Sequence, residues 1–392
     1  MSGMPPGSGF PLGGDPEQFK DAPLFRELQR VMSSSSGPVN WELARQVAIA
    51  SAVEAGDDQL PTDADRQLFE DAARVAELHV ARFTGLEAPG DVARVRPVRR
   101  AEWVTANAES LRELLEPAAK RIGEAMDRAA REQLPPEMQE MAGFMGQLSP
   151  LLMGTQVGQV LGFLAQRVFG QFDVAMPRNG PATLLFVVPN IATFEHDWSL
   201  DPTEFRTWVA LHEVTHRFEF ARPWARPRFA EVLDDFLSTL AIDMEEMQAK
   251  LTGIDAADPD AFQGLMESDE GLFGAELDDE QRLKLARIQA FMAAAEGYGD
   301  HVMHALGSEL LGSYGQIDEA MSRLDMSDSD PVFERLLGVD VGPEHYAAGR
   351  AFCDTVVELT DEVTLTRMWD SAEALPSYPE IQEPRLWLAR TV

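Results

Sequence analysis

Apolar residues recur at intervals of three and four along most of the chain, a spacing that predicts a mainly α-helical protein. The clearest apolar stripe lies within residues 64–83, and Thr62 and Asp65 supply a capping box at the start of that helix. Asp201 is a candidate N-cap for a later helix, over residues 202–220. The remaining helices are expected at residues 24–32, 39–55, 100–128, 136–169, 228–251, 278–311, 316–324, 343–359 and 362–374.

One short run departs from the helical pattern and predicts a β-strand. Residues 183–188, with the sequence TLLFVV, lie between Gly-Pro on one side and Pro-Asn on the other. The expected fold is therefore mainly α, with a small β element before the helix at 202–220. Residues 1–20 are rich in Gly and Pro and are predicted to be disordered. We expect a helical region at 21–178 and a second region at 179–392, which can together form one compact unit.

The helix expected at 202–220 contains the pattern H-E-x-x-H, from His212 to His216. Histidines four positions apart lie on one face of a helix, one turn apart, so both imidazoles can reach a single metal ion. Glu213 projects beside that face, where a carboxylate can take a proton from metal-bound water. Apolar neighbours place this helix in a core, where unliganded histidines and a glutamate would be costly. The pattern predicts His212 and His216 as zinc ligands and Glu213 as the general base.

A third protein ligand is expected, because catalytic zinc usually takes three and leaves one position for water. Glu296 follows a long apolar run in the helix expected at 278–311, so its carboxylate should be partly buried and would need a partner. Asp300 lies four positions later, on the same face of the helix. We expect Glu296 to complete the zinc site and Asp300 to accept the outer N–H of a zinc-bound histidine.

A hydrolytic site also needs a proton donor for the oxyanion that develops on the substrate. The candidates are titratable side chains in the helix of Glu296 and in a later helix, and the sequence does not choose among them. They are Tyr298, His301, His304, His345 and Tyr346.

In these motifs the chain resembles the gluzincins, in which H-E-x-x-H is followed by a glutamate ligand and, four positions later, by an aspartate. More closely, it resembles a largely actinobacterial family of zincin-like metallopeptidases, often labelled as associated with biosynthesis of a deazaflavin coenzyme. That label implies a genomic association rather than a reaction. The resemblance is carried by RAEWVTAN (100–107), GQFDVAMP (170–177), LDPTEFRTWVALHEVTHRFEF (200–220), Pro223-Trp224, AEGYGDHVM (295–303) and LPSYPEIQEPRLWLAR (375–390).

The resemblance implies a mostly helical zincin fold with Zn²⁺ as cofactor. It also implies His212, His216 and Glu296 as ligands and Glu213 as the base. By analogy with zincins, the strand expected at 183–188 would be an edge strand with which an extended peptide pairs. A short buried strand without a role in substrate binding is an equal alternative.

Composition and charge narrow the classes of function. The 392 residues carry a formal net charge of −33, which disfavours binding to nucleic acid and to anionic membranes. Polar residues interrupt the apolar segment at 151–170, so it predicts a buried helix rather than a membrane span. Its glycines, four residues apart from Gly154 to Gly162, permit a close helix approach. A single cysteine, Cys353, and an N-terminus without the features of a signal peptide predict a cytoplasmic protein.

The predicted function is a zinc-dependent hydrolase, a metallopeptidase acting on a peptide or amide; the sequence predicts no oligomeric state. One alternative is a non-catalytic, zincin-fold interaction protein whose zinc is structural, with His301 or His304 as a fourth ligand. Another is a di-metal carboxylate helical protein, since Glu213 and His216 also form an E-x-x-H pair. That architecture needs a second E-x-x-H, which the sequence lacks.

Overall fold

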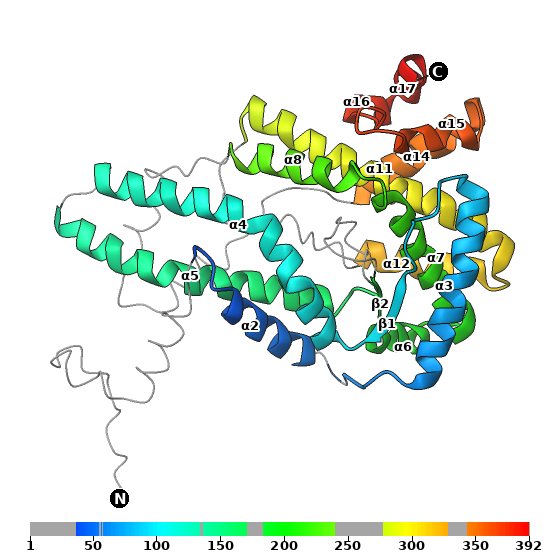
Figure 1. Cartoon of the computed structure of the whole chain (residues 1–392), viewed down its shortest axis with the longest axis horizontal. Helices are drawn as coiled ribbons and strands as arrows, with labels where there is room; N and C mark the ends of the chain where they lie inside the picture. The colour runs from blue at the N-terminus through cyan, green and yellow to red at the C-terminus, as the bar shows by residue number, and fades with distance from the viewer. Residues whose placement is uncertain are drawn as a thin grey trace, which may run out of the picture.

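Helices make up most of the protein and surround a sheet of two strands, which confirms the mainly α fold class with a small β element (Figure 1). The computed structural model describes residues 37–54, 56, 58–133, 136–170, 183–239, 277–327 and 343–391. The elements are α2 (Trp41–Glu54), α3 (Asp63–Thr84), β1 (Arg94–Val98), α4 (Arg100–Gln133), α5 (Pro136–Ala165), β2 (Thr183–Val187), α6 (Val188–Asp197), α7 (Pro202–Phe220), α8 (Ala225–Leu237), α11 (Asp279–Leu310), α12 (Tyr314–Ser327), α14 (Pro343–Leu359), α15 (Glu362–Thr366), the 3₁₀ turn η2 (Arg367–Trp369), α16 (Tyr378–Gln382) and α17 (Pro384–Thr391).

Most predicted helices are confirmed, with ends that shift by a few residues. Helix α8 begins three residues earlier than predicted, at Ala225, and ends at Leu237, whereas residues 240–251 of the predicted helix lie outside the described residues. Helices α6, α16 and α17 were not predicted, and α15 gives way at Arg367 to a 3₁₀ turn. The predictions for residues 1–20 and 24–32 lie outside the described residues, as does most of the GQFDVAMP segment.

The two strands are parallel, with Arg94 of β1 opposite Thr183 of β2 and Val98 opposite Val187. Strand β2 is buried, and its Phe186 stacks on Phe69 of α3 with ring centroids 4.3 Å apart. At its other edge β2 forms an antiparallel bridge to Gly170. Strand β2 therefore matches the buried-strand alternative rather than an open edge for a peptide.

Strand β1, which was not predicted, carries two of the basic residues that precede α4. Exposure alternates along β1, with Arg94 and Arg96 exposed and their neighbours partly or fully buried. Arg100, which begins α4, is itself buried, and its Nε donates to Asn190 Oδ1 at 2.6 Å.

Helices α2 and α5 pack closely through glycines, as the spacing predicted. A Cβ at Gly154 would lie 2.5 Å from Asn40 O, and one at Gly158 would lie 2.6 Å from Ala44 O. Only hydrogen at these positions lets the two backbones meet over the buried alanines of α2. This seam holds α5 alongside α2 (Figure 1).

The helix that carries H-E-x-x-H is held by its cap and by burial. Asp201 accepts hydrogen bonds from the backbone N–H of Thr203 and Glu204, both at 2.9 Å, which confirms the predicted N-cap. Pro202 occupies the first turn, where no intrahelical N–H is needed. Helix α7 then packs against α3 on one side and α11 on another.

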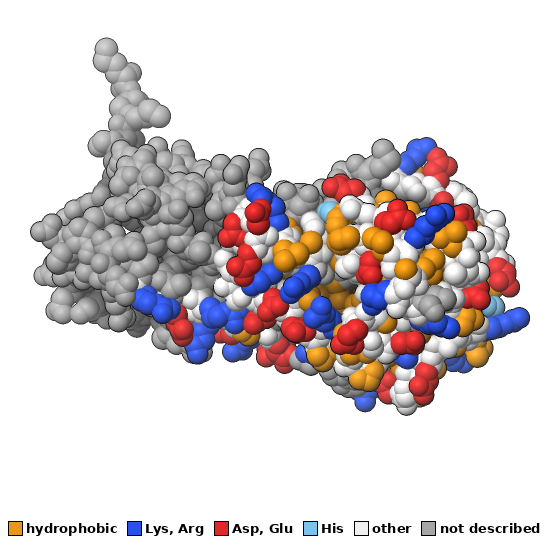
Figure 2. All heavy atoms as spheres, turned by 90° about the horizontal axis from the view of Figure 1, so that it is seen from above, with side chains coloured by type: hydrophobic (Ala, Val, Ile, Leu, Met, Phe, Trp, Pro, Cys, Tyr) orange, Lys and Arg blue, Asp and Glu red, His pale blue; other side chains and the backbone are white. Residues whose placement is uncertain are grey.

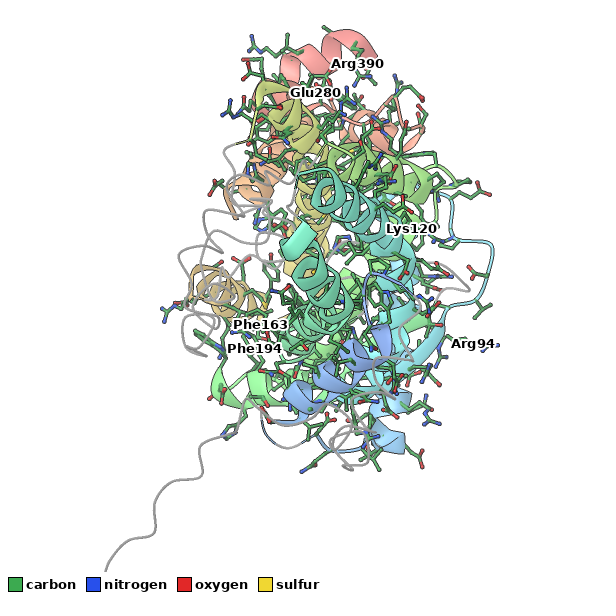
Figure 3. All side chains as sticks on the ribbon, turned by 90° about the vertical axis from the view of Figure 1, so that its left-hand side faces the viewer. Arg94, Lys120, Phe163, Phe194, Glu280 and Arg390 are labelled. Carbon is green, nitrogen blue, oxygen red and sulfur yellow. The ribbon has the colours of Figure 1, made fainter. Side chains whose placement is uncertain are left out.

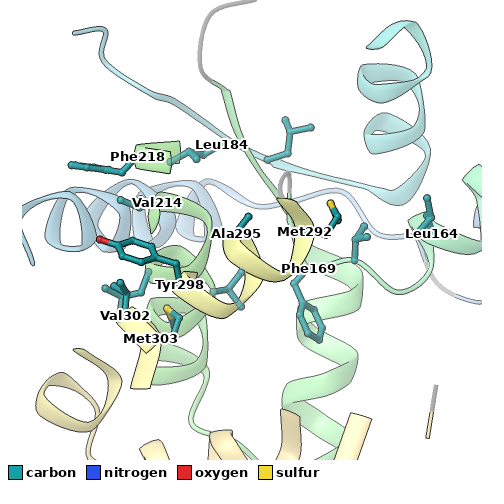
Figure 4. Packing of buried hydrophobic residues seen from close by; sticks show 14 of the residues in the cluster. Leu164, Phe169, Leu184, Val214, Phe218, Met292, Ala295, Tyr298, Val302 and Met303 are labelled. Atoms are coloured by element: carbon teal, nitrogen blue, oxygen red, sulfur yellow. The ribbon is translucent and has the colours of Figure 1, made fainter. Parts of the chain in front are cut away.

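Helix α11 is positioned by a second close glycine contact, this time with α14. A Cβ at Gly349 would overlap Ala293 O, and one at Gly297 would overlap the backbone of Gly349. Figure 4 shows the buried side chains of the core around α7 and α11, among them Val214 and Tyr298. Glu296 precedes Gly297 in the chain, so the close packing of α11 against α14 also fixes the position of the Glu296 backbone.

The surface mixes charges with scattered apolar side chains, as Figure 2 shows for one face. Among the described residues, no helix combines the length and the apolar character that a membrane crossing requires.

Candidate metal centre

Three side chains from two helices meet at one point of the core. His212 and His216 of α7 and Glu296 of α11 each offer a ligand atom, and these atoms lie within 4.8 Å of one another. The two imidazole rings are nearly perpendicular, at 87°, with centroids 4.6 Å apart. A Cβ at Gly299 would lie 3.1 Å from His216 Cε1, so the missing side chain lets α11 approach the imidazole. The structure thus brings together the set of ligands predicted from the sequence.

The orientation of His216 is set by a glutamate on its own helix. Nδ1 of His216 lies 2.8 Å from Glu219 Oε2, and both side chains are fully buried. A neutral imidazole that donates Nδ1–H to this carboxylate presents the lone pair of Nε2 to the cluster. Nε2 is buried, lies 3.6 Å from Glu296 Oε2 and has no hydrogen-bond partner among the described residues.

These observations fit a metal ion. A buried nitrogen lone pair beside a carboxylate is costly unless a cation or a proton lies between them. Two imidazoles and one carboxylate are also the donor set of known catalytic zinc sites. Glu296 is partly exposed, with 15% of its side-chain surface accessible, and His212 is also partly exposed, so the cluster is open to solvent on one side.

The carboxylates of Glu219 and Glu296 both face the imidazole of His216 and shift the pKa values at this centre. Burial lowers the pKa of His212 well below its usual value, and the charge of His216 lowers it further. Burial alone would lower the pKa of His216, but the charges of Glu219 and Glu296 outweigh it and raise that pKa well above its usual value. Burial raises the pKa of Glu219 to about 7. The two carboxylates therefore favour positive charge at this centre, which a proton or a divalent cation would supply.

The carboxylate of Glu213 is fully buried beneath the backbone that borders β2. A Cβ at Gly170 would overlap Glu213 Oε1, so only glycine fits there. Two hydrogen bonds hold this backbone in place: Trp103 Nε1 donates to Gly170 O at 2.8 Å, and Val187 N–H donates to Phe169 O at 2.7 Å. The sheet thus sets the position of the carboxylate beside the cluster.

Aromatic rings flank the two imidazoles along α7. Trp208 stacks on His212 with ring centroids 5.8 Å apart, and Phe220 stacks on His216 at 5.9 Å. These rings restrict the imidazoles and shield them from water on two sides. They follow from the same spacing of three and four residues that places the histidines on one face.

Glu219, Gly170 and Trp103 are the site residues that the sequence reading missed. A signal existed for Glu219, because it lies between Phe218 and Phe220 in a helix predicted to be buried, where a carboxylate needs a partner. No local signal marks Gly170 or Trp103, because their role depends on chain segments brought together by the sheet. At His216, the acceptor of the Nδ1–H is Glu219 and not Asp300, from which this hydrogen bond was expected. Asp300 is exposed, and its role towards His212 stays a prediction.

Two of the candidate proton donors are already engaged inside the protein. Tyr298 is buried, which raises its pKa, and its hydroxyl lies 3.5 Å from Thr366 Oγ1. His301 has Asp354 Oδ1 at 2.7 Å from Nδ1 and Glu362 Oε1 at 3.0 Å from Nε2. These contacts do not favour either as a donor to a substrate.

The other candidates differ in their surroundings. His304 is exposed, and its Nδ1 lies 3.2 Å from the hydroxyl of Tyr314. His345 is buried, with its Nδ1 2.6 Å from the hydroxyl of Tyr378, and Tyr346 is partly exposed. The identity of the donor stays a prediction.

Comparisons with known proteins find a matching family and a similar crystal structure. The model of the zincin-like metallopeptidase family matches residues 39–388. A crystal structure from Chloroflexus aurantiacus, described as that of a candidate hydrolase with a novel fold, superposes with a TM-score of 0.65 at 31% sequence identity. The match covers 90% of this chain and 98% of that one. A search of curated proteins finds no match. The chain belongs to the family of zincin-like metallopeptidases.

Proposed function

We propose that the protein is a zinc-dependent hydrolase that cleaves a peptide or amide bond. The observation that carries the proposal is the meeting of His212, His216 and Glu296, with the Nε2 atom of His216 buried and lacking a hydrogen bond from the described residues. Membership of the zincin-like metallopeptidases supports the hydrolase class, and zinc is the metal usual for zincins.

Each residue has a distinct part in the proposed reaction. His212, His216 and Glu296 would hold the metal, and Glu219 would fix the ring of His216. Zinc, when bound, supplies Lewis-acid activation that lowers the pKa of a coordinated water towards roughly 7. Glu213 accepts the proton of the attacking water at its carboxylate and then delivers it to the leaving nitrogen. Gly170 and the aromatic rings keep these groups in place and restrict the access of bulk water.

The two alternative functions have less support. A structural zinc would need a fourth ligand, yet the cluster found among the described residues holds three groups. The two histidines considered as a fourth ligand have other partners. His301 contacts two carboxylates, and His304 contacts Tyr314. A di-metal carboxylate site would need a second E-x-x-H pair.

The test combines elemental analysis with a peptide-library digest, performed with and without a chelator. The wild-type protein should contain one zinc per chain and lose hydrolysis on chelation. Glu213→Gln should keep its zinc and lose about 10²–10⁴-fold in turnover, the usual effect of removing a general base. Glu231→Gln is the matched control, because Glu231 is exposed on α8. Full turnover by the Glu213 variant would remove that residue from its role.

The third ligand is tested separately by Glu296→Ala. Loss of this carboxylate should remove zinc and hydrolysis together, with the fold checked by circular dichroism. An unchanged zinc content would show that another group completes the site.

A further inference from the structure

The free edge of the sheet and helix α3 enclose an open groove of about 720 Å³. In the part of the chain that the structure describes, β1 pairs with β2 alone, so its other edge has no strand partner. An unpaired edge can be a template for a further strand, although Pro97 has no N–H to donate to such a partner. The groove is lined by α3 from Arg66 to Glu77 and by residues 92–97 along β1.

Four arginines and three glutamates line the groove, so it is slightly basic in a chain that as a whole is strongly acidic. The side chains of Arg66, Arg94 and Arg96 are exposed and make no ion pair with any described residue. Two of the glutamates in the lining are matched, since Glu77 pairs with Arg217 and Glu102 lies 3.7 Å from Arg99. Unpaired arginines in a protein of net charge −33 mark a site of charge complementarity for an anionic partner.

The spacing of the arginines suits an extended partner. Arg94 and Arg96 project from the same face of β1, since side chains two apart share a face of a strand. Figure 3 shows Arg94 extending from the ribbon into solvent. Acidic side chains at every second position of an added strand would meet these guanidinium groups, while main-chain hydrogen bonds to β1 supply affinity.

The groove is separate from the candidate metal centre. Strand β2 lies between β1 and Gly170, whose backbone covers Glu213. On α7, the guanidinium of Arg217 reaches Glu77 at the groove wall, whereas the adjacent His216 faces Glu296 on α11. A ligand in the groove would therefore lie on the side of α7 away from the cluster.

We propose that this groove binds an acidic, extended segment of a partner protein as an additional strand on β1. The open strand edge favours a peptide over a nucleic acid, because a phosphate backbone cannot form strand-type hydrogen bonds. The proposal stands apart from hydrolysis and does not depend on it.

The experiment measures fluorescence anisotropy of a fluorescein-labelled octapeptide of alternating Glu and Val with the full-length chain. The double variant Arg94→Glu/Arg96→Glu should weaken binding by about tenfold or more, since two charge-assisted contacts become repulsive. The matched control is Arg385→Glu, an exposed arginine on α17 without an ion pair to described residues, which should leave binding unchanged. Arg66→Glu is a second variant should the double variant fail to fold.

Two further probes distinguish the class of partner. The same peptide with alternate amides N-methylated should lose affinity, because methylation blocks the strand hydrogen bonds, and oligothymidylate should compete poorly. The proposal is overturned if the probe binds more weakly than about 1 mM. It is also overturned if charge reversal at β1 has no effect, if the methylated peptide binds equally well, or if oligothymidylate binds more tightly than the peptide.

Discussion

The contact between His216 and Glu219 can be tested without touching a candidate ligand. The change is Glu219→Gln, which keeps an oxygen acceptor 2.8 Å from Nδ1 but removes the negative charge. Both side chains are fully buried, so solvent does not screen the lost interaction. Mutation of a residue that hydrogen-bonds to a ligand histidine usually lowers metal affinity by about 10–100-fold, or roughly 1.4–2.7 kcal/mol.

We expect the glutamine variant near the lower end of this range, because only the charge is lost. Glu219→Ala should reach the upper end, because it also leaves the buried Nδ1–H without an acceptor. Zinc affinity is measured by competition with a fluorescent chelator at constant pH, with Glu231→Gln as control. Thermal unfolding of each apo-protein separates weak zinc binding from a damaged fold. Zinc affinities equal to wild type in both Glu219 variants would refute the claim that this carboxylate holds the imidazole.

Two other predictions concern the general base and the pH dependence of stability. Gly170→Ala should retain zinc but reduce hydrolysis, because a Cβ would displace the carboxylate of Glu213; unchanged turnover would contradict this. Carboxylates of Asp354 and Glu362 outweigh burial and raise the pKa of His301, so this contact stabilises the fold fully below about pH 6.5 and is lost as pH rises through the raised pKa. Both carboxylates are partly exposed, so the gain is below about 1 kcal/mol. The free energy of unfolding, measured with urea from pH 5 to pH 9, should show this pH-dependent loss in the wild type and not in His301→Gln.

Local rules account for most of what the sequence predicted. The capping box of Thr62 and Asp65 forms as expected, and Asp201 caps α7, since both depend on residues within one turn. The face shared by His212 and His216 follows from helical geometry alone. Glu296 could be placed because a carboxylate after a buried apolar run needs a partner, and few partners were available.

The missed features depend on contacts between distant segments. Strand β1 was not predicted, because its alternation of charged and apolar residues is short and contains Pro97. Its pairing with β2 decides the outcome, and no local pattern reveals it. Gly170 likewise acquires its role only when the sheet carries it over Glu213.

The division of the metal cluster between α7 and α11 has a consequence for synthesis on the ribosome. His212 and His216 leave the exit tunnel well before Glu296, and the side of α7 that faces α11 is covered only when α11 packs on it. Until then a growing chain exposes two imidazoles and an apolar helix face together. Capture of the ion by all three side chains thus waits for the synthesis of α11, and a nascent chain that stalls before α11 would expose an incomplete cluster and an apolar surface to chaperones and proteases.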